Sequence, residues 1–254
     1  MGTICITGSA SGIGAATRRL LEAEGHAVVG VDLRDAEVVA DLSTPEGRAA
    51  MVAGVEAASG GSLDGLVAAA GVNGGGPALV VSVNYFGSVA TLDGLRALLA
   101  RGTNAAAVAV SSNSSTTMQG VDDRVVDACL RGDEAAARHA AAEIVDYPSS
   151  KLALARWVRR QAPTAGWIGA GIRLNAVAPG PTATPMTDDL AFPVLDLGDV
   201  YPVPIQRVAT PEEQAAVIAF LLSPAASYVV GVVVPVDGGG DAAARGDDWP
   251  SARP

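Results

Sequence analysis

Short apolar runs and helical patterns alternate along almost the whole of this chain. The apolar runs lie at residues 3–7, 27–31, 66–67, 105–110, 172–178 and 229–236. This alternation predicts parallel strands joined by right-handed helical crossovers, because parallel strands need long connections. We therefore expect an α/β protein with one doubly wound parallel sheet over residues 1–241, followed by a poorly ordered polar tail at 242–254.

The composition favours a sheet that is buried on both faces. Hydrophobic residues make up 49% of the 254 residues and aromatic residues only 4%, so Ala, Val, Leu and Ile must build most of the core. This length suits one large domain, and aliphatic side chains suit buried parallel strands. The net charge of −10 argues against a nucleic-acid partner, which would select a basic surface.

Cysteine and histidine usage limits the chemistry that is available. Cys5 and Cys129 are far apart in the sequence, which predicts buried packing residues and a reducing compartment. His26 and His139 are the only histidines, so a metal site or a Ser/His/Asp triad lacks candidate residues. No apolar stretch approaches the length of a membrane span, and the chain starts directly into a strand. We therefore expect a cytoplasmic protein with no membrane partner.

A glycine-rich turn follows the first apolar run. Its sequence, Gly8-Ser-Ala-Ser-Gly12-Ile-Gly14, leads directly into a helical pattern. A strand, a glycine-rich turn and a helix N-terminus together form an anion site, because free backbone N–H groups and the helix dipole meet a phosphate there. The turn predicts a dinucleotide site that includes Gly8, Ser11, Gly12, Ile13 and Gly14. A tight turn that binds nothing is the alternative.

An acidic residue, Asp32, ends the second apolar run twenty residues after Gly12. An acidic residue at about this distance meets the hydroxyls of the adenosine ribose in dinucleotide-binding folds. Its carboxylate would repel a 2′-phosphate, which favours NAD over NADP. The neighbouring Arg34 leaves NADP open as the alternative.

Further candidate cofactor contacts follow the later apolar runs. Asp41 and Leu42 could border the adenine, and an ordinary loop carboxylate at Asp41 fits the sequence equally well. Small side chains at the carboxyl end of a parallel strand leave room for a ligand. The remaining predicted contacts come from small residues and from the turn after residue 178: Ala70, Gly71, Pro179, Gly180, Thr182 and Thr184, the last of which could bond a nicotinamide carboxamide.

The segment Tyr147-Pro-Ser-Ser-Lys151 holds the only lysine of the chain, which has sixteen arginines. A site that keeps its lysine needs a compact ammonium with an adjustable pKa. Residues four apart share a helix face, so the Tyr147 phenol and the Lys151 ammonium are expected in one cleft. There the ammonium and a nicotinamide ring would lower the pKa of the phenol from its usual value of about 10. A surface helix that happens to carry both residues is the alternative.

Two further polar residues interrupt apolar segments. Asn84 lies on the apolar face of a helical segment at 80–87, where it either braces a bend or holds a water in a relay. Ser112 ends the strand predicted at 105–110, and its hydroxyl could hold a substrate carbonyl. Serine also occurs in that stretch simply because loops are polar.

Two segments are expected to shape the substrate side. An insert at about 113–146 precedes Tyr147, with helices expected at 122–130 and 133–146. The insert would line the substrate pocket or make a subunit contact. Residues 187–208 lack a clear period and are expected to form a lid.

Several motifs occur in the order characteristic of the short-chain dehydrogenase/reductases: Thr7-Gly-x-x-x-Gly12-x-Gly14, Asn84, Ser112, Tyr147-x-x-x-Lys151 and Pro179-Gly180. The chain resembles that family from residue 3 to about residue 240. The resemblance implies a Rossmann-type fold in which Tyr147 is the general acid/base and Lys151 lowers its pKa and binds the nicotinamide ribose. It also implies that Ser112 positions the substrate oxygen and that Asn84 anchors a proton-relay water.

Within this family the chain most resembles the bacterial 3-alpha-hydroxysteroid dehydrogenase/carbonyl reductases. The likeness lies at residues 26–48, 80–87, 172–185 and 223–239 and in the long interval between Ser112 and Tyr147. One departure is Ala68-Ala-Ala-Gly71, where the family usually has Asn-Asn-Ala-Gly, so that polar contacts are lost.

The resemblance implies an NAD-dependent enzyme that interconverts a secondary alcohol and a ketone, with a hydroxysteroid or similar alicyclic substrate. One alternative is a carbonyl reductase or dihydrodiol dehydrogenase that acts on a smaller substrate. Another is a non-catalytic dinucleotide-binding sensor. Exposed apolar helix faces in such folds usually pair, so a homodimer or homotetramer is expected.

Overall fold

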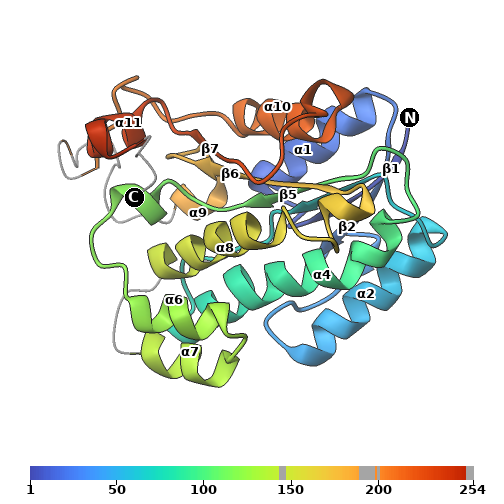
Figure 1. Cartoon of the computed structure of the whole chain (residues 1–254), viewed down its shortest axis with the longest axis horizontal. Coiled ribbons are helices and arrows are strands. Elements are labelled where there is room, and N and C mark those ends of the chain that lie inside the picture. Colours follow the sequence, from blue (N-terminus) through green and yellow to red (C-terminus); the bar gives the residue numbers. More distant parts are fainter. Residues whose placement is uncertain (143–146, 189–197, 199–200, 250–254) are drawn as a thin grey trace.

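The computed structural model describes residues 1–142, 147–188, 198 and 201–249, which form a sheet between two layers of helices (Figure 1). The strands are β1 (Thr3–Thr7), β2 (Ala27–Asp32), β3 (Val38–Val39), β4 (Gly65–Ala68), β5 (Ala106–Val110), β6 (Arg173–Pro179) and β7 (Val233–Val236). Their order in the sheet is β3-β2-β1-β4-β5-β6-β7, and neighbouring strands are parallel. The predicted doubly wound sheet is confirmed. Its connectivity reverses between β1 and β4, where folds of this type bind ligands.

Helices cover both faces of the sheet (Figure 1). One face carries α1 (Gly12–Ala23) and α10 (Pro211–Leu222), and the other carries α2 (Pro45–Ser59), α4 (Ser88–Leu99) and α8 (Tyr147–Gln161). A short helix α3 (Pro77–Val81) and a π-helix (Ser82–Gly87) lead into α4. The smaller helices are α5 (Ser114–Thr117), α6 (Asp123–Leu130), α7 (Glu134–Ala141), α9 (Pro185–Asp188) and α11 (Gly240–Arg245), with 3₁₀ turns at Ile168–Ala170, Pro224–Ala226 and Gly246–Asp248.

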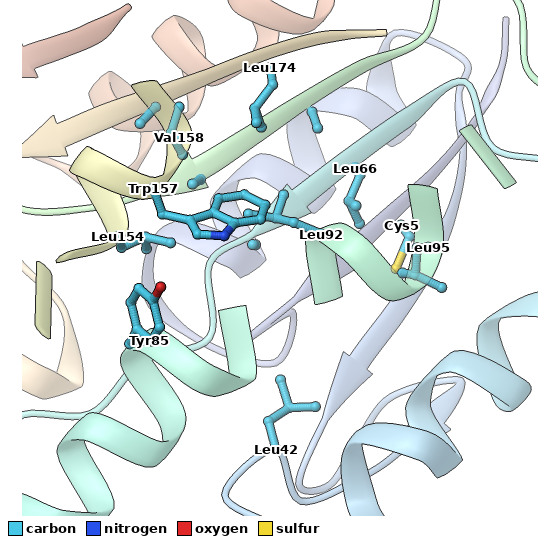
Figure 2. Packing of buried hydrophobic residues seen from close by; sticks show 14 of the residues in the cluster. Cys5, Leu42, Leu66, Tyr85, Leu92, Leu95, Leu154, Trp157, Val158 and Leu174 are labelled. Carbon is cyan, nitrogen blue, oxygen red and sulfur yellow. The ribbon is translucent and has the colours of Figure 1, made fainter. Parts of the chain in front are cut away.

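Each face of the sheet buries its own hydrophobic cluster. Successive strand residues point to opposite faces, so Ile4 and Ile6 pack under α1 and α10 while Cys5 packs under α4. Figure 2 shows the second cluster, in which Trp157 of α8 lies close to Tyr85 and Leu154. Cys5 and Cys129 are both buried, as expected for packing residues.

The continuous helical stretch Pro77–Leu99 is, among the described residues, the one helix long and apolar enough to cross a membrane. Within the fold, however, 67% of its most apolar window is buried. Its apolar side chains include Val81, Leu92 and Leu95, which belong to the core cluster of Figure 2. Packing in the core therefore explains why the stretch Pro77–Leu99 is so apolar.

The insert forms a helical hairpin outside α8. The helices predicted at 122–130 and 133–146 appear as α6 and α7, each of which begins with a capping aspartate, Asp122 or Asp133. Residues 143–146 lie outside the described residues, as do residues 189–197 and 199–200, which are half of the predicted lid at 187–208. Figure 1 shows α6 and α7 beside the end of α8 that carries Tyr147.

The last strand is shorter than the run predicted at 229–236. The Asn175 side chain of β6 takes the place of ladder bonds there: its Nδ2 donates to the Val229 carbonyl at 2.9 Å, and its Oδ1 accepts from the Val232 N–H at 3.1 Å. Gly231 adopts a positive φ of 73° between them, which strands do not allow. The parallel ladder begins only at Val233.

The polar tail predicted at 242–254 is ordered over its first part. Residues Gly240–Arg245 form α11, and a 3₁₀ turn continues to Asp248. The Asp241 carboxylate explains this order, because it accepts a hydrogen bond from Thr116 at 2.6 Å and pairs with Arg245 at 2.7 Å. Residues 250–254 lie outside the described residues.

Arg173, a buried arginine of β6, caps the C-terminus of α10. The Arg173 guanidinium, 6% exposed, donates to four carbonyls at and beyond the C-terminus of α10, at distances between 2.7 and 3.2 Å: those of Leu221, Leu222, Ser223 and Ala226. A cation at a helix C-terminus satisfies carbonyls that have no partner within the helix.

We expect Arg173→Met to lower the free energy of unfolding by about 2–4 kcal/mol, because several buried carbonyls lose a charged donor. For a chain of this size the melting temperature would fall by about 5–15 °C, which thermal unfolding measures. Arg159→Met is the matched control, because exposed Arg159 donates a single bond to Gly231, and its expected change is below about 0.5 kcal/mol. Equal losses in the two variants would contradict the capping role.

Candidate active site

An open cavity of about 1010 Å³ lies at the carboxyl ends of the strands. Nearly all of the side chains singled out in the sequence line it: Gly8, Ser11, Gly12, Ile13, Gly14, Asp32, Asp41, Leu42, Ala70, Gly71, Ser112, Tyr147, Lys151, Pro179, Gly180, Thr182 and Thr184. Asn84 lies behind the wall of the cavity instead of lining it. The fold thus brings residues from the ends of many elements to one crevice, as a doubly wound sheet requires.

The glycine-rich turn packs tightly between β1 and α1. Gly8 has a φ of +72°, and a Cβ there would lie 2.9 Å from the backbone of Ala70. A Cβ on Gly14 would lie 2.0 Å from the Gly8 carbonyl oxygen. Ser11 begins α1 without a side-chain cap, so the first N–H groups of the helix have no capping side chain where they meet the cavity. This arrangement suits an anion such as a phosphate.

The Asp32 carboxylate lies beside this turn. Its Oδ2 accepts from the Ala10 N–H at 3.0 Å and its Oδ1 from the Leu33 N–H at 2.7 Å, so the side chain is fixed at the cavity edge. Arg34, by contrast, is 86% exposed, faces Asp35 at 4.0 Å and is not among the residues that line the cavity.

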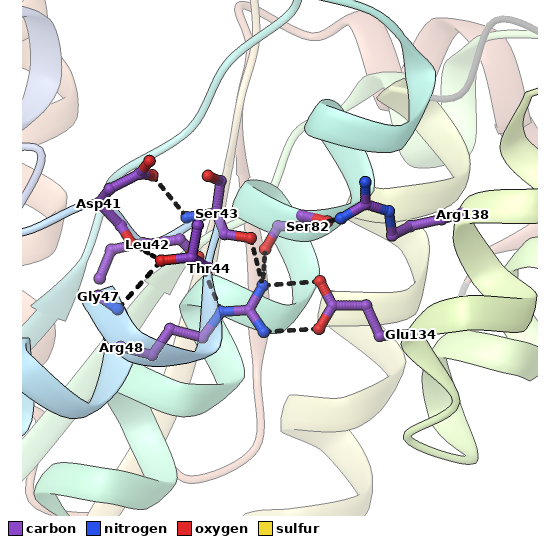
Figure 3. A network of polar contacts seen from close by, with 9 residues as sticks. All are labelled: Asp41, Leu42, Ser43, Thr44, Gly47, Arg48, Ser82, Glu134 and Arg138. Atoms are coloured by element: carbon purple, nitrogen blue, oxygen red, sulfur yellow. Dashed lines mark hydrogen bonds and ion pairs between the residues drawn. The ribbon is translucent and has the colours of Figure 1, made fainter.

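The loop after β3 is held from outside by Arg48 of α2 (Figure 3). The Arg48 guanidinium donates to the Leu42 carbonyl at 2.8 Å and to the Ser82 carbonyl at 2.9 Å, and it forms a two-point ion pair with Glu134 of α7 at 2.6 and 2.8 Å. Within the loop, hydrogen bonds from Ser43 hold the pKa of the Asp41 carboxyl below its usual range. The cavity wall at Leu42 is thereby tied to the insert.

Tyr147 and Lys151 line the same cavity, as the sequence predicted. The Lys151 Nζ lies 5.7 Å from the centroid of the Tyr147 ring and donates to the Val110 carbonyl at 2.9 Å. Burial raises the pKa of the Tyr147 phenol, and a hydrogen bond with Ser112 lowers it only in part. Burial also lowers the pKa of Lys151 to about 8. In the protein alone, burial therefore outweighs the hydrogen bond with Ser112, and the lowering of the Tyr147 pKa by the ammonium and a nicotinamide ring together stays a prediction.

A second bond fixes α8 against β5. The Ser111 hydroxyl donates to the Lys151 backbone carbonyl at 2.8 Å, while the Lys151 ammonium bonds the carbonyl of Val110, the residue before Ser111. Sequence reasoning did not assign a role to Ser111. The signal was its position at the end of a buried strand, immediately before Ser112.

Asn84 braces the loop after β4. Its Oδ1 accepts from the Val72 N–H at 2.8 Å and its Nδ2 donates to the Val72 carbonyl at 2.9 Å, and the side chain is fully buried. The residue lies in the π-helix, a distortion that often marks functional sites. These contacts brace the loop after β4, whereas the sequence predicted a braced helix bend or a water relay, and the relay role stays a prediction.

Gly71 lies where the braced loop meets the buried lysine. A Cβ on this residue would lie 3.2 Å from the Asn84 Oδ1 and 3.3 Å from the Lys151 Nζ. A side chain here would therefore press on both polar groups. The Ala-Ala-Ala-Gly sequence keeps this glycine while it loses the polar side chains usual at the two positions before Ala70.

Ser112 projects its hydroxyl towards Tyr147 with both acceptor positions in use. The Ser112 Oγ accepts from the Ser114 N–H at 3.2 Å and from the Ser114 hydroxyl at 2.9 Å. A hydroxyl has one proton and two lone pairs, so the Ser112 proton is left to donate. Ser114 and Met118 of the insert also line the cavity, and so does Tyr201 of the segment predicted as a lid; the sequence singled out these segments but not these residues.

The turn after β6 closes the cavity opposite the glycine-rich turn. A Cβ on Gly180 would lie 2.7 Å from the Cα of Asp237, so only glycine fits without a shift. Thr182 is buried and donates to the Gly180 carbonyl at 2.9 Å, which commits its hydroxyl to the turn. The Thr184 side chain faces Gly12, from whose Cβ position it lies 3.3 Å away.

Known proteins resemble this chain over nearly its whole length. It is 46% identical to the 3-alpha-hydroxysteroid dehydrogenase/carbonyl reductase of Comamonas testosteroni, covering 96% of this chain and 98% of the relative. It is 36% identical to the cis-4-hydroxycyclohexanecarboxylate dehydrogenase of Sinomonas cyclohexanicum, covering 92% and 94%. Among solved structures, the 3-alpha-hydroxysteroid dehydrogenase from Pseudomonas sp. B-0831 complexed with NADH matches with a TM-score of 0.88 and 46% identity, covering 94% of this chain and 97% of that one.

A family model described as enoyl-(acyl carrier protein) reductase matches residues 8–241. That range begins at the first glycine of the turn and ends just after β7, so it includes every element that lines the cavity. The match, the relatives and the shared fold agree with the order of motifs in the sequence. The chain is an oxidoreductase that belongs to the short-chain dehydrogenase/reductase family.

Proposed function

We propose that this enzyme uses NAD to interconvert a secondary alcohol and a ketone, with a hydroxysteroid or a similar alicyclic compound as substrate. The observation that carries the proposal is the meeting of Ser112, Tyr147 and Lys151 with the glycine-rich turn in one cavity. A proton-transfer group beside a dinucleotide site is what oxidation of an alcohol requires.

The residues present fit NAD. The cradle at Gly8 and Gly14 has no room for a Cβ, and the start of α1 lacks a capping side chain, which suits the pyrophosphate. Asp32 would hold the adenosine ribose hydroxyls, with Asp41 and Leu42 near the adenine. Ala70, Gly71, Pro179, Gly180, Thr182 and Thr184 would line the nicotinamide half, and Lys151 would bind its ribose. The solved relative complexed with NADH supports this cofactor.

The protein's own residues would manage the proton. In the oxidation direction the Tyr147 phenolate takes the hydroxyl proton of the substrate, and the Ser112 hydroxyl keeps its own proton and donates a hydrogen bond to the substrate oxygen. Bound NAD supplies the acceptor for the hydride. Asn84, which holds Val72 in place, keeps the loop after β4 against this site and is proposed to anchor a relay water.

Lys151 sets the electrostatics of that proton transfer. Its ammonium is 3% exposed, and burial brings its pKa to about 8. Because this pKa lies near neutral pH, the amine of Lys151 can gain or lose its proton when the surroundings of the cavity change. We propose that Lys151 and the positive nicotinamide ring together lower the pKa of the Tyr147 phenol once the cofactor is in place.

The substrate class follows from the relatives and the cavity. The relatives described above act, by their names, on a hydroxysteroid and on a hydroxycyclohexane carboxylate, both of which are cyclic alcohols. A cavity of about 1010 Å³ is at the upper end of the usual range for small-molecule sites, so it has room for a dinucleotide and a second molecule. A smaller cyclic alcohol or dihydrodiol is the second candidate, which the cyclohexane relative favours.

Three further expectations from the sequence stay predictions. These are a cytoplasmic location, a homodimer or homotetramer, and a subunit contact made by the insert.

The proposed reaction is tested by NADH formation from NAD with androsterone, a 3-alpha-hydroxysteroid, or with cyclohexanol. We expect turnover of androsterone to exceed that of cyclohexanol, and Tyr147→Phe to lower kcat by about 10²- to 10⁴-fold because the proton acceptor is lost. NADH binding, measured by its fluorescence, should be unchanged in this variant. Tyr228→Phe is the control, since Tyr228 is fully exposed.

Turnover of cyclohexanol alone would transfer the proposal to the smaller substrate class. A Tyr147→Phe variant within tenfold of wild type would show that another group moves the proton. If the wild type binds NADH but turns over neither alcohol, the result would favour the alternative of a non-catalytic dinucleotide-binding sensor.

For Asp32→Ala we expect the ratio of kcat/KM for NAD to that for NADP to fall about tenfold or more, because a contact worth about 1.4 kcal/mol to the ribose is lost and repulsion of a 2′-phosphate is removed. Steady-state kinetics with both cofactors measures it. The neighbouring Asp35, whose side chain is 84% exposed, provides the control Asp35→Ala, which should keep the wild-type ratio. An unchanged ratio in Asp32→Ala would place the ribose contact elsewhere.

The buried ammonium predicts a pH-dependent stability. Below pH 8, Lys151 is charged in both states and burial disfavours the folded one. As the pH rises from about 8 towards 10.5, the folded state loses the proton first, so folding is increasingly favoured. Relative to Lys151→Met, the wild type should gain about 3 kcal/mol of unfolding free energy over this window, measured by urea unfolding without cofactor. A difference that stays constant with pH would contradict the lowered pKa.

A further inference from the structure

Tyr201 lines the same cavity as Tyr147, and its hydroxyl is held from outside the catalytic motif. The Tyr201 hydroxyl donates to the Oδ1 of Asn113, the residue that follows Ser112. Asn113 is 1% exposed, and its backbone N–H donates to the Pro179 carbonyl at 3.0 Å. The ring of Tyr201 is therefore fastened to the ends of β5 and β6, which carry the catalytic serine and the turn at Gly180.

The orientation of this contact is set by Asp237, which follows β7. The Asn113 Nδ2 donates to the Asp237 Oδ2 at 3.2 Å. A carboxylate only accepts, so the amide must turn its NH₂ towards Asp237 and its oxygen towards Tyr201. Asp237 is itself fixed by the N–H groups of Gly239 at 3.1 Å and Asp241 at 2.6 Å. Asp237 thus holds the Asn113 side chain in place, and Asn113 in turn holds the Tyr201 hydroxyl.

The phenol of Tyr201 is unsuited to acid/base chemistry. Burial raises its pKa, the neighbouring Tyr147 raises it further, and its proton is already committed to Asn113. Tyr147 and Tyr201 both line this cavity. What Tyr201 offers the cavity is a neutral aromatic ring in a fixed position, and an aromatic ring packs well against hydrocarbon.

We propose that Tyr201 is a substrate-positioning residue: its ring packs against the alicyclic body of the substrate, and Asn113 and Asp237 hold it there through the Tyr201 hydroxyl. This inference rests on the function proposed above. It assigns a role in substrate binding to a residue outside the motif that performs the chemistry.

The test compares wild type, Tyr201→Phe, Asn113→Ala and the double variant, with Tyr228→Phe as the matched exposed control. Tyr201→Phe keeps the ring and loses one hydrogen bond, so KM for androsterone should rise about 3- to 10-fold, the effect of about 1 kcal/mol. Both kcat and KM for NAD should stay within about twofold of the wild-type values, because the proposal assigns Tyr201 a contact with the substrate body alone. A general loss of structure would change all three.

The double variant tests whether Tyr201 acts through Asn113. If it does, Tyr201→Phe adds nothing to the KM of Asn113→Ala, whereas independent residues would multiply their effects. If Asn113→Ala does not fold, the test rests on Tyr201→Phe alone, in which KM for androsterone should rise while KM for NAD and kcat stay unchanged. An unchanged KM for androsterone, or an equal rise in KM for NAD, would overturn the proposal.

Failure of the proposed function can be told apart from failure of this inference. If the wild type turns over no alcohol, binding of androsterone is measured directly by equilibrium dialysis in the presence of NADH. Weaker binding by Tyr201→Phe than by wild type would then still support positioning by Tyr201. Equal binding, or none by the wild type, would overturn it.

Discussion

Two hydrogen bonds between β5 and α8 determine where the chemistry of this protein takes place. The Lys151 ammonium donates to the Val110 carbonyl, and the Ser111 hydroxyl donates back to the Lys151 carbonyl. Because β5 is an interior strand, this pair fixes the first turn of α8 to the interior of the sheet. Tyr147 opens that turn. The crevice, the insert and the turn after β6 are arranged around a helix end whose position these bonds set.

The same contact places a lone ammonium in a poorly solvated site. The ion pairs found among the described residues are made by arginine, and most lie at the surface. Lys151 bonds a neutral carbonyl instead, so its charge is uncompensated and its pKa is low. An arginine could not respond in this way, because it stays charged in proteins. The sequence signal of a single lysine among sixteen arginines thus has a physical basis in desolvation.

Much of the fold and of the cavity lining was predictable from the sequence, because both follow from where strands end. Alternation located the strands, and the residues after their carboxyl ends necessarily meet at one edge. What depends on three-dimensional surroundings was not predictable. The direction in which the Tyr147 pKa shifts depends on burial and on the hydrogen bond with Ser112, and a spacing of four residues holds no such information. Order at Asp241 depends on Thr116, and the role of Tyr201 depends on Asn113 and Asp237, all distant in sequence.

The two serines inside the Tyr-Pro-Ser-Ser-Lys segment give it a second use. Ser149 accepts from the backbone N–H of Asp122, the residue that caps α6, and Ser150 bonds both the Tyr147 carbonyl and the Asn84 side chain. The insert therefore docks on the catalytic segment through a main-chain group that any residue except proline can supply. A change of side chain at residue 122 would therefore keep this hydrogen bond, whereas the rest of the attachment depends on particular side chains, such as buried Val125 and Val126 and the Glu134 carboxylate that pairs with Arg48.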